Sequence, residues 1–223
     1  MINKKLKNYI EKEILSQYDE NNGHGKSHIE NVIKRSFELN DKFNLHLELN
    51  MIYVIAAYHD LGYKIDAGNH EEVSSNLFMQ DDMMKTFFSD EDRKIIKEAI
   101  TDHRASLEYE PRSIYGKLIS SADREINVKK YLKRSIFFQA NKHKNENPTV
   151  DAVINYSYKK ISSKYGKEGY AKMYYPDDTY KNYLKEIQML INDRNSFIQT
   201  ELEIIRNEFH NNKIDLNNYF YKN

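Results

Sequence analysis

A histidine and an aspartate stand side by side at the end of the most apolar segment of the chain. They are His59 and Asp60, and they follow the run from Met51 to Tyr58. Burying an imidazole beside a carboxylate is costly unless something binds both groups. A divalent cation does so, because neutral imidazole and carboxylate are both good metal ligands. The pair indicates a metal site, but a His-Asp dipeptide alone is weak evidence and needs partners from elsewhere in the chain.

Two further residues have the types and settings of such partners. His28 lies in HIENV, near the start of an amphipathic segment, and Asp123 lies in KLISSADRE, after an apolar patch. Both segments are predicted to be helical. Metal sites in helical proteins are built from inward-pointing side chains on facing helices, and this pattern is compatible with that arrangement. The alternative is four unrelated polar residues.

The order H…HD…D on predicted helices resembles the HD superfamily of metal-dependent phosphohydrolases. Here the pieces read HGKSHIENV, AAYHDLGY and ISSADRE, and the resemblance covers about residues 22–130. It extends more weakly to KKISSKYGKEGYAKMYY and DRNSFIQTELEII, which resemble the C-terminal helices of small bacterial HD hydrolases. The combined motif is specific for fold and metal binding but not for substrate.

The resemblance implies a first divalent metal, which ligand chemistry leaves open among Mn, Fe, Co, Mg, Zn and Ni. The ligands implied for it are His28, His59, Asp60 and Asp123. His70 and His103 match the places where many HD enzymes bind a second metal or the substrate phosphate. One ion is therefore expected, and a second is left open.

The resemblance also implies the reaction. A water activated by the metal would cleave a phosphoester of a nucleotide or another small phosphorylated metabolite, as a phosphomonoesterase or a phosphodiesterase. The residues expected to act in catalysis are Asp60, His103 and Arg124. Further candidates for contact with the phosphate, as cations or donors, are His24, Lys26, Lys64 and Arg104. His24 would alternatively orient His28.

Each accessory residue also has an ordinary structural interpretation. His70 would be an exposed residue at a helix start, His103 a last-turn histidine favoured by the helix dipole, and His24 a surface loop residue. The candidate lysines and arginines would be solvated charges. Tyr58 and Tyr63 bracket the HD pair and would either pack in the core or stack on a base.

Composition excludes several other classes of protein. The chain has no cysteine, which excludes disulfides, thiolate zinc sites and a cysteine nucleophile. No P-loop, Rossmann or serine-hydrolase motif occurs. Lys plus Arg equals Asp plus Glu at 34 each, so no global field indicates nucleic acid or an anionic membrane. The apolar runs are too short for a membrane span, and the N-terminal segment lacks a signal-peptide core. The expected location is the cytoplasm, and the expected partner is a small phosphorylated substrate.

The elements that must position these residues are predicted to be helices. Only seven glycines and three prolines interrupt 223 residues, which favours long helices over many short strands. We expect an all-α HD-type bundle forming a single domain over 1–223, with a motif core at about 22–130 and a C-terminal helical extension at about 131–210. Helices are expected at about 2–18, 27–43, 47–61, 70–88, 91–103, 113–125, 149–164 and 178–210, and a continuation of the sixth through 139 is left open. Loops 62–69 and 104–113 would determine substrate choice.

Two other functions remain open from the sequence. One is a catalytically silent regulatory module that binds a nucleotide and keeps a structural metal. The other is a helical interaction protein that uses the apolar face of the 178–210 helix. A homodimer formed through that helix is compatible with any of the three functions.

Overall fold

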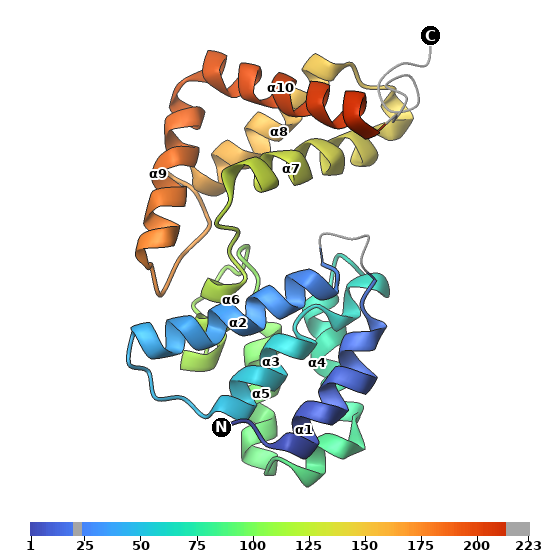
Figure 1. Ribbon diagram of the computed structural model, residues 1–223, viewed down its shortest axis with the longest axis vertical. Helices are drawn as coiled ribbons and strands as arrows, with labels where there is room; N and C mark the ends of the chain where they lie inside the picture. Colours follow the sequence, from blue (N-terminus) through green and yellow to red (C-terminus); the bar gives the residue numbers. More distant parts are fainter. Residues whose placement is uncertain (20–23, 213–223) are drawn as a thin grey trace. The chain divides into compact units, whose positions relative to one another are not determined.

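The protein is all-α, as predicted. A computed structural model describes residues 1–19 and 24–212, with side chains through residue 208, and this part of the chain contains helices and no strand (Figure 1). It divides into two compact units. Unit 1 comprises Met1–Arg124 with Met173–Pro176, and unit 2 comprises Glu125–Lys172 with Asp177–Asn223. The single-domain organisation expected from the sequence stays a prediction.

Unit 1 is built around a short helix that is almost entirely buried. Its helices are α1 (Lys4–Tyr9), α2 (Lys26–Lys42), α3 (Leu49–Tyr58), α4 (His70–Gln80), α5 (Asp90–Thr101) and α6 (Ile114–Ala122). A π-helical turn and three 3₁₀ turns extend or connect them, at Ile10–Ile14, Leu15–Gln17, Leu61–Lys64 and Asp82–Thr86. Every residue of α3 from Met51 to Tyr58 is buried, and α3 packs against α2, α4, α5 and α6 (Figure 1). The apolar run is thus the core of the unit.

Side-chain caps determine where several of these helices begin. Glu48 accepts a hydrogen bond from the backbone N–H of Met51 and starts α3. Ser89 and Asp92 form a capping box at the start of α5, which satisfies two backbone donors reciprocally. Ser113 caps α6 through the N–H of Gly116. These caps fix where the three helices start, and the candidate site residues His59, His103 and Asp123 lie at or just beyond the opposite ends.

Unit 2 consists of α7 (Val128–Lys142), α8 (Val150–Tyr165), α9 (Asp178–Asn192) and α10 (Arg194–Asn212). The continuation of the sixth predicted helix through 139, which the sequence left open, does not occur, because α6 ends at Ala122 and Asn127 caps a separate helix, α7. The predicted single helix at 178–210 is wrong. Asp193 has an extended backbone, ends α9, and accepts hydrogen bonds from the N–H groups of Asn195 and Ser196 at the start of α10.

In the described part of the chain, none of the helices combines the length and the hydrophobicity that a membrane span requires.

Candidate metal centre

Three helix ends deliver the four residues predicted to bind the first metal. His28 lies in the first turn of α2, His59 and Asp60 directly follow α3, and Asp123 is the residue at which α6 ends. A helix end orients a side chain while leaving it free of neighbours on the next turn. The three ends converge within unit 1, so residues that are far apart in the sequence become neighbours.

The four side chains point at one another. His28 Nε2 lies 3.1 Å from Asp123 Oδ1 and 3.4 Å from Asp60 Oδ2. His59 Nε2 lies 3.3 Å from Asp60 Oδ2 and 3.9 Å from Asp123 Oδ1. Ligand atoms of His28, His59 and Asp123 all lie within 4.8 Å of one another. The structure thus brings together the residues that the sequence singled out.

Two nitrogens at the centre of this group make no hydrogen bond to any residue that the structure describes. His28 Nε2 and His59 Nε2 are buried and lack a hydrogen-bond partner among the described residues, although carboxylate oxygens are close to both. The other ring nitrogen of His59 is occupied, because Nδ1 donates to the carbonyl oxygen of Ala56 at 2.8 Å. Such a backbone bond fixes ring orientation and directs the free nitrogen inward, as it does for metal-binding histidines. The donor set therefore fits a divalent cation.

A second group shares the carboxylate of Asp60. His70 Nε2 lies 3.2 Å and His103 Nε2 lies 3.5 Å from Asp60 Oδ1, and the two nitrogens are 3.2 Å apart. Both rings are anchored through Nδ1, His70 to the carbonyl of Ala67 at 3.2 Å and His103 to that of Ile100 at 2.6 Å. His70 and His103 are buried, so the exposed position considered for His70 is not what the fold shows. One oxygen of Asp60 faces this pair, and the other faces His28 and His59.

A glycine allows the segment after Asp60 to approach α4 closely. A Cβ atom on Gly62 would lie 2.6 Å from the Cβ of Val73 and 2.8 Å from the carbonyl oxygen of His70. The N–H of Gly62 donates to Ser74 Oγ at 2.8 Å. The approach places Asp60 next to the start of α4, where His70 lies.

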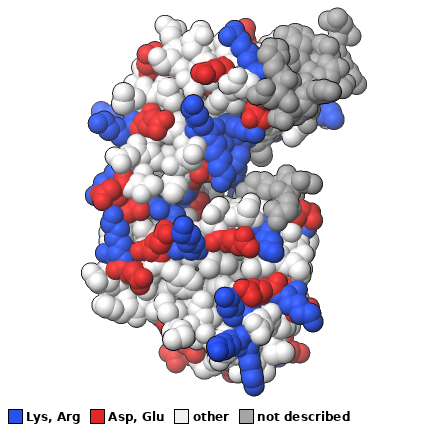
Figure 2. Space-filling model, viewed as in Figure 1, with Lys and Arg blue, Asp and Glu red and all other residues white. Residues whose placement is uncertain are grey.

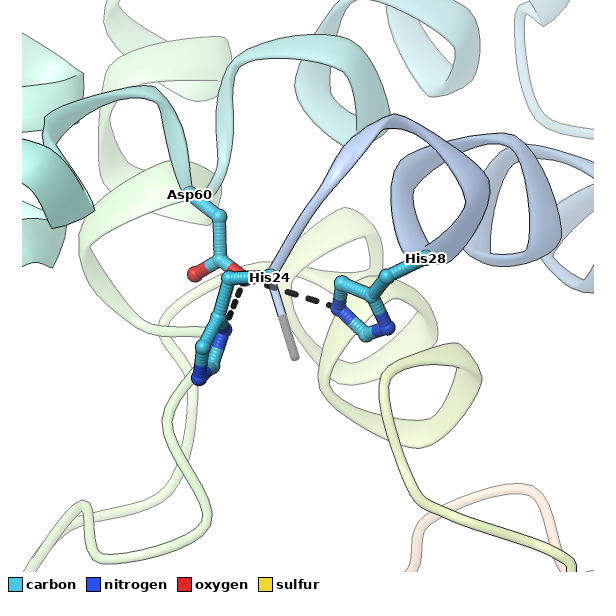
Figure 3. A group of neighbouring side chains, drawn as sticks. All are labelled: His24, His28 and Asp60. Carbon is cyan, nitrogen blue, oxygen red and sulfur yellow. Dashed lines mark hydrogen bonds and ion pairs between the residues drawn. The ribbon is translucent and has the colours of Figure 1, made fainter. Parts of the chain in front are cut away.

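His24 is part of the same group of side chains and not a free surface residue. Its Nδ1 lies 2.6 Å from Asp60 Oδ2, and Figure 3 shows its ring and that of His28 on either side of that oxygen. The ring of Tyr63 stacks on His24, with centroids 3.9 Å apart and planes inclined by 21°. Tyr63 therefore lies beside the site, whereas Tyr58 is buried and donates to Asp81.

The electrostatics of the group favour charged carboxylates. Burial would raise the pKa of Asp60, but His59, His103 and His24 outweigh it and hold that pKa well below its usual value. The pKa of Asp123 is lowered by His28 in the same way, against burial. Burial alone would lower the pKa of His28, yet Asp123 and Asp60 raise it to about 9. The site is thus a buried anionic pair that holds a proton on His28 when no metal is present.

Arg124 is close to the group but faces inward. It is buried, donates to Ser120 Oγ at 2.6 Å, and lies 3.7 Å from Asp123 Oδ2. It also donates at 3.5 Å to the carbonyl oxygen of His103. These contacts connect Asp123 to His103, so Arg124 is placed to position both residues.

The other predicted cations are mostly engaged elsewhere in unit 1. Arg104 donates through Nη1 to Glu71 at 2.8 Å and to the carbonyl of Gly68 at 2.6 Å. Lys64 donates to the carbonyl oxygen of Gln17 at 2.5 Å and pairs with Asp19 at 2.9 Å. Lys26 is the first residue of α2 and is partly exposed. None of these contacts joins a lysine to the carboxylates of the site.

Sequence reasoning missed a buried ion pair beside His103. Asp102 is fully buried and accepts two hydrogen bonds from the side chain of Arg112, at 2.7 and 2.9 Å, and one from its N–H at 2.8 Å. Tyr109 OH donates to the same carboxylate at 3.0 Å. Asp102 therefore closes the segment 104–113 back onto the end of α5. The only sequence signal was its position next to His103 in TDHRAS.

Comparisons with known proteins add a distant likeness in structure. No family model matches the sequence, and no curated protein matches it. A structure search finds the crystal structure of a predicted HD superfamily hydrolase from an uncultured Thermotogales bacterium, at 16% identity and a TM-score of 0.45. The match covers 92% of this chain and 91% of the other. Such a remote likeness leaves the assignment of function to the site itself.

Proposed function

We propose that this protein is a metal-dependent phosphohydrolase of the HD type, acting on a nucleotide or another small phosphorylated metabolite. One observation carries the proposal. Two buried imidazole nitrogens, on His28 and His59, face two carboxylates and have no hydrogen bond among the described residues. Buried polar groups normally have hydrogen-bond partners, and a divalent cation would satisfy both nitrogens and both carboxylates at once.

The ligands proposed for the first ion are His28, His59, Asp60 and Asp123. Asp60, His70 and His103 offer a second set, which would hold a second ion or donate hydrogen bonds to the phosphate. A divalent cation at such a site supplies Lewis acidity toward a phosphoryl oxygen and lowers the pKa of water.

The chain's own residues would orient the reacting groups. Asp60 holds His24 at hydrogen-bonding distance and Tyr63 covers one face of that ring, so His24 is placed to contact a phosphoryl oxygen. Arg124 keeps Asp123 and the backbone at His103 together. Arg104 contacts Glu71 through one terminal nitrogen, and binding a phosphate would require it to exchange or share that partner.

The test begins with protein stripped of metal and then reconstituted separately with Mn²⁺, Fe²⁺, Co²⁺, Mg²⁺, Zn²⁺ or Ni²⁺. Each form is assayed on a panel of phosphomonoesters and phosphodiesters. Asp60→Asn keeps the shape of the side chain but removes its charge, and we expect turnover to fall by roughly a hundredfold or more. Asp151→Asn, at an exposed position on α8, is the matched control and should keep full activity.

Two results would contradict the proposal. Equal turnover in Asp60→Asn and the parent protein would refute the assigned site. Tight nucleotide binding without hydrolysis under any of the metals would favour the regulatory module instead, with the metal in a structural role.

A further inference from the structure

Positive charge is concentrated in one stretch of unit 2. Residues 125–172 contain eleven Lys and Arg residues and four Asp and Glu residues, a formal charge of +7 in a chain whose net charge is zero. Helix α7 contributes five of these cations and no acid. Figure 2 shows Lys and Arg side chains gathered where Figure 1 places α7. Neutrality of the whole chain therefore conceals a local basic region.

Aromatic rings and cations are paired along the seam between α7 and α8, which pack together. Lys164 Nζ lies 5.2 Å from the ring centroid of Tyr131, and Lys160 Nζ lies 5.9 Å from that of Phe138. Farther along, the ring of His143 stacks on Tyr156 with centroids 3.9 Å apart. From Tyr131 to His143 the helix rises by about 18 Å. We call the two cation–ring pairs and the stacked ring pair together the aromatic–cation ladder.

The middle pair of the ladder is accessible, because Phe138 is 51% exposed, an unusual position for a phenylalanine in this fold. The rings of Tyr131, His143 and Tyr156 are partly buried. Exposed lysines lie on α7, α8 and the segments that follow them: Lys129, Lys142, Lys144, Lys159, Lys160 and Lys167. Some of the neighbouring charge is already balanced, because Lys133 pairs with Glu208 and both Lys130 and Arg134 lie near Glu125. Glu146 contacts His143 and Tyr156 at one end of the ladder.

We propose that the α7–α8 face, through its aromatic–cation ladder, binds single-stranded nucleic acid. Proteins bind single strands without strong sequence preference by combining a basic track for the phosphates with aromatic rings on which bases stack. The lysines of this face and the exposed ring of Phe138 provide both features. This inference does not depend on the proposed hydrolase activity.

A membrane surface and a protein partner fit this face less well. A helix that binds a membrane surface inserts a broad apolar face, whereas the apolar face of α7, with Leu132, Ile136 and Ala140, is buried in the unit. A protein partner is usually anchored by a cluster of aromatic residues in a desolvated centre. Here the rings are spread along the seam, each beside a cation or another ring.

The test measures the fluorescence anisotropy of a labelled twelve-nucleotide oligo(U) titrated with the full-length, metal-free protein in EDTA, which prevents hydrolysis. Affinity should fall about tenfold or more between 50 and 200 mM salt, as a contact with several phosphates requires. A duplex of the same length should bind more weakly than the single strand.

Two variants and two matched controls identify the surface. Phe138→Ala should weaken binding about fivefold or more, the lower end of the range for loss of one stacked base. Lys160→Gln should reduce the slope of log K against log salt by about 0.7. Met189→Ala and Lys185→Gln change an exposed apolar residue and an exposed lysine on α9 and should leave binding unchanged.

Three results would overturn the proposal. One is an absence of oligonucleotide binding at 50 mM salt. Another is equal weakening by the variants and by their controls, which would indicate unspecific attraction. The third is binding to vesicles containing anionic phosphatidylglycerol but not to oligo(U), which would assign the face to a membrane surface. Circular dichroism of each variant verifies that the helices are intact.

Discussion

Binding of a metal at the candidate site should release protons, and the affinity should rise with pH. The pKa of His28 is raised to about 9 because Asp123 and Asp60 outweigh the effect of burial. Below that value the ring is protonated in the metal-free protein, whereas a histidine ligand must be neutral. Raising the pH toward 9 therefore removes the proton on His28, which competes with the metal for the ring nitrogen.

The size of the effect follows from the number of protons displaced. Each displaced proton gives a tenfold gain in apparent affinity per pH unit, so His28 alone predicts about 30-fold between pH 6.5 and 8.0. The pKa of His59 is also raised, with burial opposing Asp60, and His59 adds to the slope wherever it is protonated. Asp60 and Asp123 contribute no protons, because their pKa values are lowered and they are already ionised.

Calorimetric titration with Mn²⁺ or Zn²⁺ at several pH values measures both quantities. Two buffers with different ionisation enthalpies give the number of protons released, which should be about one or more at pH 7. His143→Gln changes a histidine in unit 2 and should leave the slope intact. An affinity that does not change between pH 6.5 and 8.0, with no proton release, would refute the reasoning from His28.

Three other predictions concern stability. Metal at a hundred times its dissociation constant should stabilise unit 1 by about 2.7 kcal/mol, so EDTA should lower the unfolding midpoint; an unchanged midpoint would count against a metal site in the folded state. Burial raises the pKa of Glu201 to about 8, against the hydrogen bond from Ser157. The contribution of Glu201 to the free energy of unfolding is therefore fully present below its unfolded-state pKa and is lost as the pH rises toward 8. Glu201→Gln removes this loss. The free energy of unfolding of the variant minus that of the parent, measured with denaturant, should rise by roughly 3 kcal/mol between pH 5.0 and 7.5; a difference that stays constant over this range would contradict the prediction. Arg112→Gln should cost roughly 2 kcal/mol and increase hydrogen exchange in 104–113, and unchanged exchange would show that Asp102 does not hold that segment.

The sequence predicted which residues gather at the site because their local settings were informative. His59 and Asp60 end an apolar helix, and a polar pair in that position has few inexpensive structural explanations. The gathering of His28 and Asp123 beside them followed from the motif, since spacing along the chain does not specify which helix ends converge. The structure shows the reason, which is that α3 packs against α2 and α6.

The break in the last predicted helix shows where hydrophobic periodicity fails. Ile187 and Ile191 on α9, and Phe197 after the break, are all buried, so an apolar pattern continues through Asp193. The local signal was the Asp-Arg-Asn-Ser sequence, in which the aspartate side chain accepts from the N–H group three residues on. A capping residue within an apolar pattern can end one helix and start another, and hydrophobic periodicity alone does not reveal such a break.

Contacts made by loops could not be predicted from the sequence. Asp102 and Arg112 are ten residues apart in an irregular segment, and the pair forms only because 104–113 folds back on the end of α5. Many other charged residues lie at similar separations in this chain, so nothing in the charge pattern distinguishes these two. Burial of Asp102 makes the pair necessary, and burial is a property of the folded unit.

Asp60 connects the parts of the candidate site. One of its oxygens lies near His24, His28 and His59, and the other lies near His70 and His103. A carboxylate shared in this way couples the two sets of histidines electrostatically, because a change in the charge of either set changes the field at both oxygens. The two sets of ligands are therefore coupled, so a cation bound at one set alters the affinity of the other. The adjacent residues that drew attention in the sequence thus include the side chain on which the rest of the site depends.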